Sequence, residues 1–169
     1  VSGTGNVSTY TVEKATQLGA KVIAVSDSQG YVYDEQGVQA ETLKELSKHG
    51  RGALKYYTKL HPDAEYFNKQ SVWNASMKYD IAFPCATQNE IDQEMAQNLV
   101  ENCEIKALFE GANMPSTDEA IEIYKEKNIL YGLGKAANAG GVAVSALEMA
   151  QNAQREQWSA EEVDESLQI

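Results

Sequence analysis

Val1-Ser2-Gly3-Thr4-Gly5-Asn6-Val7-Ser8 opens the chain, and the rest of the sequence is organised around its Gly-x-Gly spacing. Gly3 permits a tight turn at a strand end, and Gly5 lets the backbone approach phosphate oxygens. The amides that open the next helix, from about Asn6, then point at the anion along the helix dipole. Ser8 takes the third, small position of the fingerprint. The stretch predicts a pyrophosphate-binding loop, although an ordinary glycine turn also fits the motif taken alone.

An amphipathic helix is predicted directly after this loop, over residues 7–18. Val12, Ala15 and Leu18 share one face of that helix, and Gly19 follows as its C-terminal cap. A strand end, a glycine loop and a helix in this order favour a nucleotide-binding loop over a simple turn.

Asp27 follows the second predicted strand, residues 21–26. That strand is apolar without polar alternation, as expected of a strand buried on both faces of a parallel sheet. An acidic residue about 20 positions after the loop is where a dinucleotide site places the partner of the adenosine ribose hydroxyls. The alternative is an aspartate that merely caps the turn before Gly30, and the residues alone leave both interpretations open.

Strands and helices alternate along the rest of the chain. Predicted strands cover residues 79–83, 107–109 and 129–131, with a small edge strand or hairpin at 31–33 and a weak candidate at 64–66. Predicted helices cover residues 40–48, 91–102, 116–127, where Ser116 is the cap, and 134–157, where Leu147 and Met149 are expected in the core. The alternation predicts one α/β domain with a doubly wound, mostly parallel sheet, a Rossmann-like dinucleotide-binding fold.

Both ends of the sequence look cut rather than natural. Only two residues precede Gly3, whereas a strand usually has about five, so the first strand is expected to be truncated. Ser159 and Glu162 form the pattern of a capping box that opens a new helix only a few residues before the end of the sequence.

Composition excludes several classes of function. The 169 residues carry a formal net charge of -11, which argues against a nucleic-acid partner because such proteins concentrate Lys and Arg on one face. Cys85 and Cys103, with the isolated His49 and His61, give neither a disulfide framework nor a metal site. No apolar run is long enough to span a membrane, and no signal peptide opens the chain. We therefore expect a cytoplasmic protein without a metal.

Three polar or glycine-rich segments are expected at the rim of the site, because ligands of open α/β sheets gather at the carboxyl ends of strands. They are residues 85–89, 110–115 and 134–145. In the last of them, Val142 and Ser145 are three apart and share one helix face. Taken alone, that block is better explained as a glycine-loosened helix start packed on the sheet.

Five blocks in the right order give the sequence a specific resemblance. They are GTGNV at residues 3–7, SDS at 26–28, FPCATQN at 83–89, FEGANMP at 109–115 and GKAANAGGV at 134–142. Together they resemble the hexameric glutamate dehydrogenases, over the whole chain but only over the coenzyme-binding domain of that family. The departures are Ser8, where alanine is common, and Leu133, where proline often precedes the last block.

The resemblance implies one site that runs along a bound dinucleotide. Its residues are Gly3, Gly5, Asn6 and Val7 at the pyrophosphate, Asp27 and Ser28 at the adenosine ribose, Ala86, Thr87 and Gln88 along the dinucleotide, Asn113 and Asn138 near the nicotinamide, and Val142 and Ser145 at the substrate side chain. No catalytic residue is assigned to this chain, because the family's catalytic lysine and aspartate belong to its other domain. We expect residues 1–158 to be the coenzyme domain and residues 159–169 to lead back to that missing domain.

The implied reaction is reversible NAD(P)-dependent oxidative deamination of L-glutamate to 2-oxoglutarate and ammonia, by a complete protein that forms a hexamer. Asp27 by the general rule favours NAD, since a carboxylate repels the 2′-phosphate of NADP. The Ser26-Asp27-Ser28 block nevertheless resembles the NADP-using bacterial members, and Lys48 and Arg51 are candidates for the compensating charge. We expect NADP, with NAD as the alternative.

Two other functions stay open. One is a related branched-chain or aromatic amino-acid dehydrogenase, against which the Ser145 hydroxyl argues, since an apolar side chain has no use for a donor. The other is a non-catalytic dinucleotide-sensing module, which leaves the block at residues 134–145 without a purpose. In the block at residues 134–145 the only titratable group is Lys135, which by resemblance belongs to the loop structure, so the base and the cationic partners that glutamate deamination needs are missing there. This chain alone is therefore expected to be inactive and to bind a dinucleotide at most weakly.

Overall fold

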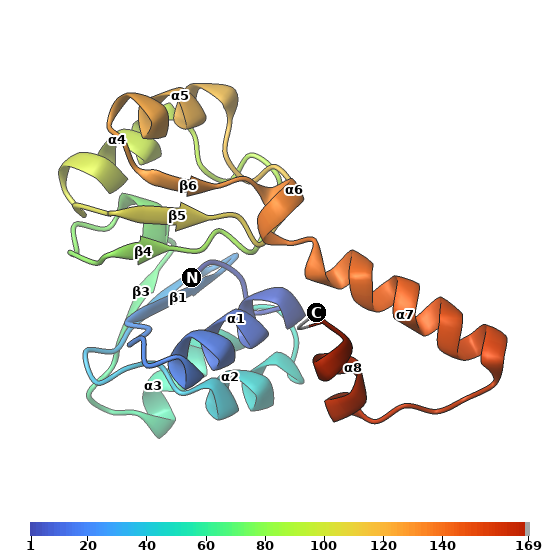
Figure 1. Cartoon of the computed structure of the whole chain (residues 1–169). Helices are drawn as coiled ribbons and strands as arrows, with labels where there is room; N and C mark the ends of the chain where they lie inside the picture. Colours follow the sequence, from blue (N-terminus) through green and yellow to red (C-terminus); the bar gives the residue numbers. More distant parts are fainter. Residues whose placement is uncertain (168–169) are drawn as a thin grey trace.

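Two three-stranded β-sheets form the centre of the computed structural model, which describes residues 1–167 (Figure 1). The first sheet is antiparallel in the order β1-β2-β3, with β1 Ala24–Asp27, β2 Gly30–Tyr33 and β3 Glu65–Asn68. The second sheet is parallel in the order β4-β5-β6, with β4 Ile81–Ala82, β5 Ala107–Phe109 and β6 Leu130–Gly132. The predicted α/β, Rossmann-like fold is confirmed.

The first two residues join the two sheets. On one side, the amide of Ser26 donates to the carbonyl of Val1 at 3.1 Å, and Ser2 forms a parallel bridge with Ser26. On the other side, the amide of Ser2 donates to the carbonyl of Phe83 at 3.0 Å, just after β4. The hydrogen-bonded surface therefore continues from β1 through this short segment to β4.

The strand expected at residues 21–26 differs from its prediction in its pairing. It begins at Ala24 and pairs antiparallel with β2, because a two-residue turn joins the strands into a hairpin. Residues 24–26 are buried, as predicted for a strand covered on both faces. The segment predicted as an edge strand or hairpin near residue 31 is β2. It forms a hairpin with β1, as one of the two alternatives stated, but it lies between β1 and β3 rather than at an edge of the sheet.

Two apolar cores lie on opposite faces of β1 and β2. Val25 and Val32 point to one core, where helices α1 and α2 contribute Val12 and Leu43. Ala24 and Tyr31 point to the other core, which continues under the parallel sheet and its helices. Because neighbouring strand residues face opposite sides, both cores are filled by the same short strands.

Helices α1–α3 lie beside the antiparallel sheet, and α4 and α5 cover the parallel one (Figure 1). Their bounds, with those of two 3-10 helices, are α1 Asn6–Gln17, α2 Ala40–Ser47, η1 Ala53–Tyr56, α3 Tyr57–Leu60, η2 Val72–Asn74, α4 Gln93–Glu101 and α5 Asp118–Glu126. Gly19 follows α1 with φ 88°, as expected of a C-terminal cap. Leu18, however, was predicted on the apolar face and is 79% exposed. The cap of α5 is Thr117, whose hydroxyl accepts from the amide of Ala120, and not Ser116.

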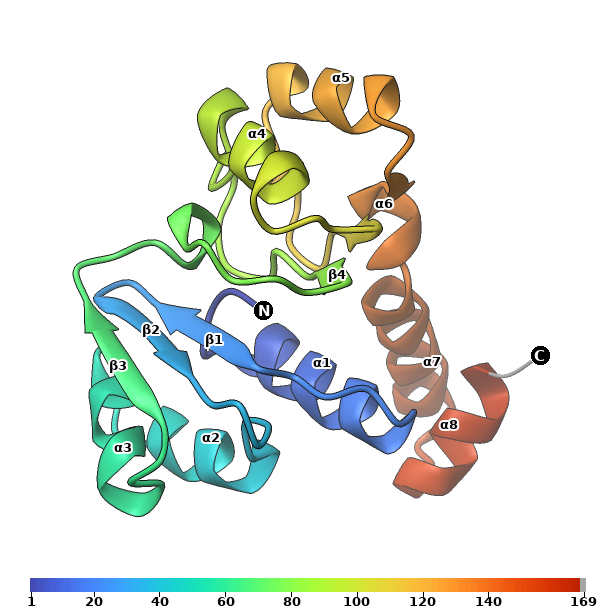
Figure 2. The same cartoon turned by 90° about the vertical axis from the view of Figure 1, so that its left-hand side faces the viewer.

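The last fifth of the chain leaves the body of the two sheets after its first short helix (Figure 2). It contains α6 Gly134–Ala137, α7 Gly140–Gln154 and α8 Ala160–Leu167. The capping box of α8 is confirmed, since Ser159 and Glu162 exchange backbone-to-side-chain hydrogen bonds. The prediction that Met149 lies in the core is wrong, because it is 73% exposed, and Leu147 is only partly buried. The structure describes every residue of α7, and none of them is buried.

Tyr57 offers a test of the first core. Its hydroxyl donates to the buried Asp34 carboxylate at 3.1 Å and accepts from the amide of Gln39 at 2.9 Å. We expect Tyr57→Phe to lower the free energy of unfolding by about 1–3 kcal/mol, because it leaves both groups without their partner. Urea unfolding measures this loss, and an exposed variant, Tyr10→Phe, serves as the control.

The same pair gives a dependence on pH. Burial raises the pKa of Tyr57 to about 12, against about 10 in an unfolded chain. The fold therefore favours the neutral phenol, whose contribution is complete below about pH 10 and is lost as the pH rises toward about 12. The difference in unfolding free energy between wild type and Tyr57→Phe should shrink from about pH 10 to about pH 12. A constant difference would contradict this assignment.

Candidate functional site

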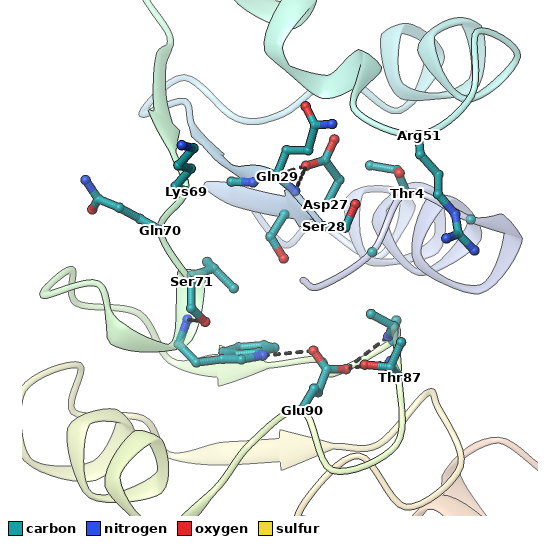
Figure 3. A pocket seen from close by; sticks show the side chains of 18 of the residues that line it. Thr4, Asp27, Ser28, Gln29, Arg51, Lys69, Gln70, Ser71, Thr87 and Glu90 are labelled. Atoms are coloured by element: carbon teal, nitrogen blue, oxygen red, sulfur yellow. Dashed lines mark hydrogen bonds between the residues drawn. The ribbon is translucent and has the colours of Figure 1, made fainter.

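An open cleft of about 1160 Å³ lies at the carboxyl end of β1, next to the glycine loop (Figure 3). A dinucleotide-sized ligand needs a space of this order. The lining residues come from five parts of the chain: Gly3–Gly5, Ser26–Gly30, Ser47 with Gly50 and Arg51, Asn68–Trp73, and Cys85–Thr87 with Glu90. The cleft therefore gathers segments that are far apart in the sequence.

The glycine loop forms one wall of the cleft. Gly3 has φ 88°, and a Cβ there would lie 3.3 Å from the Cys85 carbonyl oxygen and from Cβ of Ala86. Gly5 is the N-cap residue of α1, and Asn6 is the first helical residue. Since Gly5 has no side chain to cap the helix, the first amides of α1 are open to an anion. The loop and helix start have the form that the sequence predicted.

Asp27 fits both of its interpretations. Its Oδ1 accepts from the amides of Gln29 at 2.7 Å and of Gly30 at 3.2 Å, so it does cap the hairpin turn. Its Oδ2 is buried and has no hydrogen-bond partner among the described residues. A buried carboxylate oxygen without a donor is unusual. This oxygen is therefore an unsatisfied acceptor in the lining of the cleft, beside Ser28, which also lines it.

The turn after β4 supplies the opposite wall. Ala86 and Thr87 line the cleft as predicted, whereas Gln88 is not among the lining residues. Glu90 lines it too and was not predicted. Its Oε1 accepts from the amides of Ala86 at 3.0 Å and Thr87 at 3.3 Å, and its Oε2 accepts from Nε1 of Trp73 at 2.9 Å. The only sequence feature that could have indicated this role for Glu90 is its position directly after the polar turn at residues 85–89.

Asn113 and Asn138 are brought together, but outside the lining of the main cleft. Nδ2 of Asn138 donates to Oδ1 of Asn113 at 3.1 Å and to the carbonyl of Ala112 at 3.2 Å. The fully buried Glu110 was also missed by the sequence analysis. Its Oε2 accepts from the amide of Gly134 at 2.9 Å, which fixes the loop after β5 to the start of α6.

Val142 and Ser145 are not placed at the cleft. Both lie on α7, where Val142 is 74% exposed and Ser145 is also exposed. Neither residue lines the cleft. The shared helix face that the sequence predicted is present, but within the described residues nothing covers it.

Two cations line the cleft. Arg51 does so as predicted, and Lys69, which follows β3 with φ 56°, joins it. Lys48, the other candidate, instead forms an exposed ion pair with Glu45 at 2.6 Å and is not a lining residue. Positive charge in the cleft therefore comes from the turn after α2 and from the segment after β3, and the two side chains lie on opposite sides of Asp27 (Figure 3).

The two cysteines are both free and buried, and burial raises the pKa of each thiol. Within residues 1–167, no group of three or more His, Cys, Asp or Glu side chains is arranged to hold a metal ion. In the same range, none of the helices has the length and apolar character needed to cross a membrane.

Comparison with known proteins gives close matches. The family model described as Glutamate/Leucine/Phenylalanine/Valine dehydrogenase matches residues 1–169. A glutamate dehydrogenase of Bacteroides thetaiotaomicron is 50% identical over 170 residues, which are 99% of this chain and 37% of that protein. An NADP-specific glutamate dehydrogenase of Escherichia coli is 51% identical over 172 residues, with the same two shares. The chain thus spans little more than a third of the length of these relatives.

Solved structures similar to this chain are also glutamate dehydrogenases. A crystal structure of Plasmodium falciparum glutamate dehydrogenase matches with a TM-score of 0.90 and 46% identity, over 98% of this chain and 36% of that one. Another structure, named glutamate dehydrogenase, matches with a TM-score of 0.89 at 37% identity. The resemblance found in the five sequence blocks is confirmed.

The glycine loop gives a second test. Gly3→Ala should weaken dinucleotide binding by about tenfold or more, because the new Cβ presses on Cys85 and Ala86 and shifts the backbone of the glycine loop. Gly19→Ala is the matched control, since Gly19 also has φ 88° but has open space around it. Each variant should lose about 1–2 kcal/mol of stability. Titration of the complete protein should show weaker binding only for Gly3→Ala, and equal binding by both variants would contradict the assignment.

Proposed function

This chain belongs to the glutamate/leucine/phenylalanine/valine dehydrogenase family, and we propose that it is the coenzyme-binding domain of a glutamate dehydrogenase. The complete enzyme would deaminate L-glutamate reversibly to 2-oxoglutarate and ammonia. The observation that carries this proposal is the cleft, where a glycine loop, an open helix start and a partnerless carboxylate oxygen meet. Relatives about half identical to this chain, named glutamate dehydrogenases, support the choice of reaction.

The residues present fit a dinucleotide. We assign its pyrophosphate to Gly3, Gly5 and the first amides of α1, because these donors and the helix dipole favour an anion. We assign the adenosine ribose to the free Oδ2 of Asp27 and to Ser28, at the other end of the same wall. The nicotinamide of the bound coenzyme would supply the hydride acceptor. The chain's own contribution is to hold and orient the coenzyme and to exclude water from it.

The rest of the reaction is proposed to need the remainder of the enzyme. Residues 1–158 would form the coenzyme domain, and residues 159–169 would lead toward a domain that binds substrate. Val142 and Ser145 are proposed to line the substrate pocket from the exposed face of α7, opposite that domain. A hexameric assembly and a cytoplasmic location also stay predictions.

We propose NADP as the coenzyme. Asp27 is less repulsive to a 2′-phosphate than the general rule implies, because two backbone amides already donate to its Oδ1. Arg51 and Lys69 line the cleft and offer compensating positive charge. The relatives of Escherichia coli and Haemophilus influenzae are named NADP-specific, which supports the same choice.

The coenzyme choice is tested with charge variants of the complete enzyme. Arg51→Ala and Lys69→Ala should each raise the KM for NADP by about tenfold and leave the KM for NAD nearly unchanged, because charge-assisted hydrogen bonds to phosphate are worth about 1.5–3 kcal/mol. Lys48→Ala is the control, since Lys48 pairs with Glu45 outside the cleft. An enzyme that prefers NAD and ignores all three substitutions would rule out NADP.

The substrate is tested at Ser145. The complete enzyme should turn over glutamate and not leucine, valine or phenylalanine, whereas a sensing module would turn over none of them. Ser145→Val should raise the KM for glutamate by about tenfold, because it removes a hydroxyl donor near the substrate side chain. Val144→Thr, a change of the neighbouring residue on α7, is the control. Unchanged kinetics in Ser145→Val would remove this residue from the site.

A further inference from the structure

Glu90 connects three segments that are distant from one another in the sequence, and Figure 3 shows it beside the turn that carries Thr87. Its Oε1 accepts from the Ser2 hydroxyl at 2.9 Å and from the amides of Ala86 and Thr87, and its Oε2 accepts from the indole of Trp73. Four donors thus converge on one carboxylate. We propose that Glu90 is a positioning residue that sets the shape of the coenzyme cleft, an inference that rests on the coenzyme role proposed above.

The first connection runs to the glycine loop. Ser2 is 1% exposed and precedes Gly3 directly. Its hydroxyl donates to Glu90 and accepts from the amide of Cys85 at 2.9 Å. Through Ser2, the carboxylate holds the start of the phosphate loop and the turn after β4 at a fixed separation.

That separation matters because the two walls touch. A Cβ added at Gly3 would lie only 3.3 Å from Cβ of Ala86 and from the carbonyl oxygen of Cys85. Ala86 and Thr87 are outside any helix or strand, so the bonds from their amides to Glu90 replace those of regular structure. Without the carboxylate, this turn would lose two of its fixed points and would be free to shift against the glycine loop.

The second connection runs to the segment after β3. Trp73 is 3% exposed, and its amide donates to the Ser71 hydroxyl at 3.2 Å. Ser71 belongs to the segment that carries Lys69 along the cleft. The bond from the Trp73 indole to Glu90 therefore fixes the end of the segment after β3 that lines the cleft.

A carboxylate in a cleft for a phosphorylated ligand is unexpected on charge alone. Here both oxygens are engaged by neutral donors, and charge-assisted bonds of this kind are stronger than neutral ones. Glu90 consequently acts through the chain segments that it holds, and not by touching the phosphates. Its loss should affect the binding of coenzyme and leave the binding of glutamate nearly unchanged.

The experiment uses the complete enzyme and NADPH, whose fluorescence reports binding. Glu90→Ala removes all four acceptor contacts and should raise the Kd for NADPH by about tenfold or more. Glu90→Gln keeps one oxygen but turns an amide toward the Trp73 indole, and should raise it by a few-fold. Glu122→Gln is the matched control, because Glu122 is exposed and pairs only with Lys125.

A double substitution tests the specific contact. Trp73→Phe removes the indole N–H that donates to Oε2. In the double variant, the side-chain NH2 of Glu90→Gln therefore no longer opposes another hydrogen-bond donor. The double variant should therefore bind NADPH no more weakly than Glu90→Gln alone. The KM for glutamate should stay within about twofold of wild type in all of these variants, whereas general destabilisation would lower the active fraction without a selective change in coenzyme affinity.

The outcomes separate the two proposals. If wild type binds NADPH and Glu90→Ala binds it equally well, Glu90 has only a structural role and the inference is overturned alone. If wild type binds neither NADPH nor NADH, the proposed function fails and the inference falls with it. If Glu90→Ala does not fold, the NADPH affinities of Glu90→Gln and of the double variant with Trp73→Phe test the proposal. Losses of affinity that add up in the double variant would overturn the proposed contact between Glu90 and Trp73.

Discussion

The structure depends on a pair of hydrogen bonds made by its first two residues. Val1 accepts from Ser26 on one side, and Ser2 donates to Phe83 on the other. Without this segment, the antiparallel and parallel sheets share no ladder. The chain leaves the junction at Gly3, so the phosphate loop emerges where the two sheets meet. The site is therefore located by the joint itself, since both walls of the cleft continue the strands on its two sides.

An acidic chain that binds an anionic coenzyme needs positive potential without net positive charge. Backbone amides meet this need at the start of α1, where the helix dipole adds to them. The acidic residues near the site are turned to structural use: Asp27 caps the hairpin, and Glu90 and Glu110 each accept from backbone amides. The net charge of -11 consequently says little about the local field in the cleft.

The C-terminal helices show the limit of periodicity as evidence. The pattern of α7 correctly indicated a helix and the face shared by Val142 and Ser145, but Met149 is exposed rather than buried. Periodicity states which residues share a face. It does not state which surface covers that face, because burial depends on packing partners that lie elsewhere. The same reason applies to Leu18, which ends α1 beyond the apolar core.

The sequence by itself determined most of the strands and helices, the glycine loop, the cap at Gly19, the capping box at Ser159 and the family, whereas α3 was not predicted and the helix predicted over residues 134–157 is divided into α6 and α7. These features rest on contacts within a few residues, where backbone geometry and local hydrogen bonds decide the conformation. Only the tertiary structure decided that β1 forms a hairpin, that Lys69 and not Lys48 lines the cleft with Arg51, and that Glu90 connects three segments distant in the sequence. Those features join residues far apart in the chain, and a hydrogen bond or ion pair between them exists only once the sheets have brought them within about 3 Å.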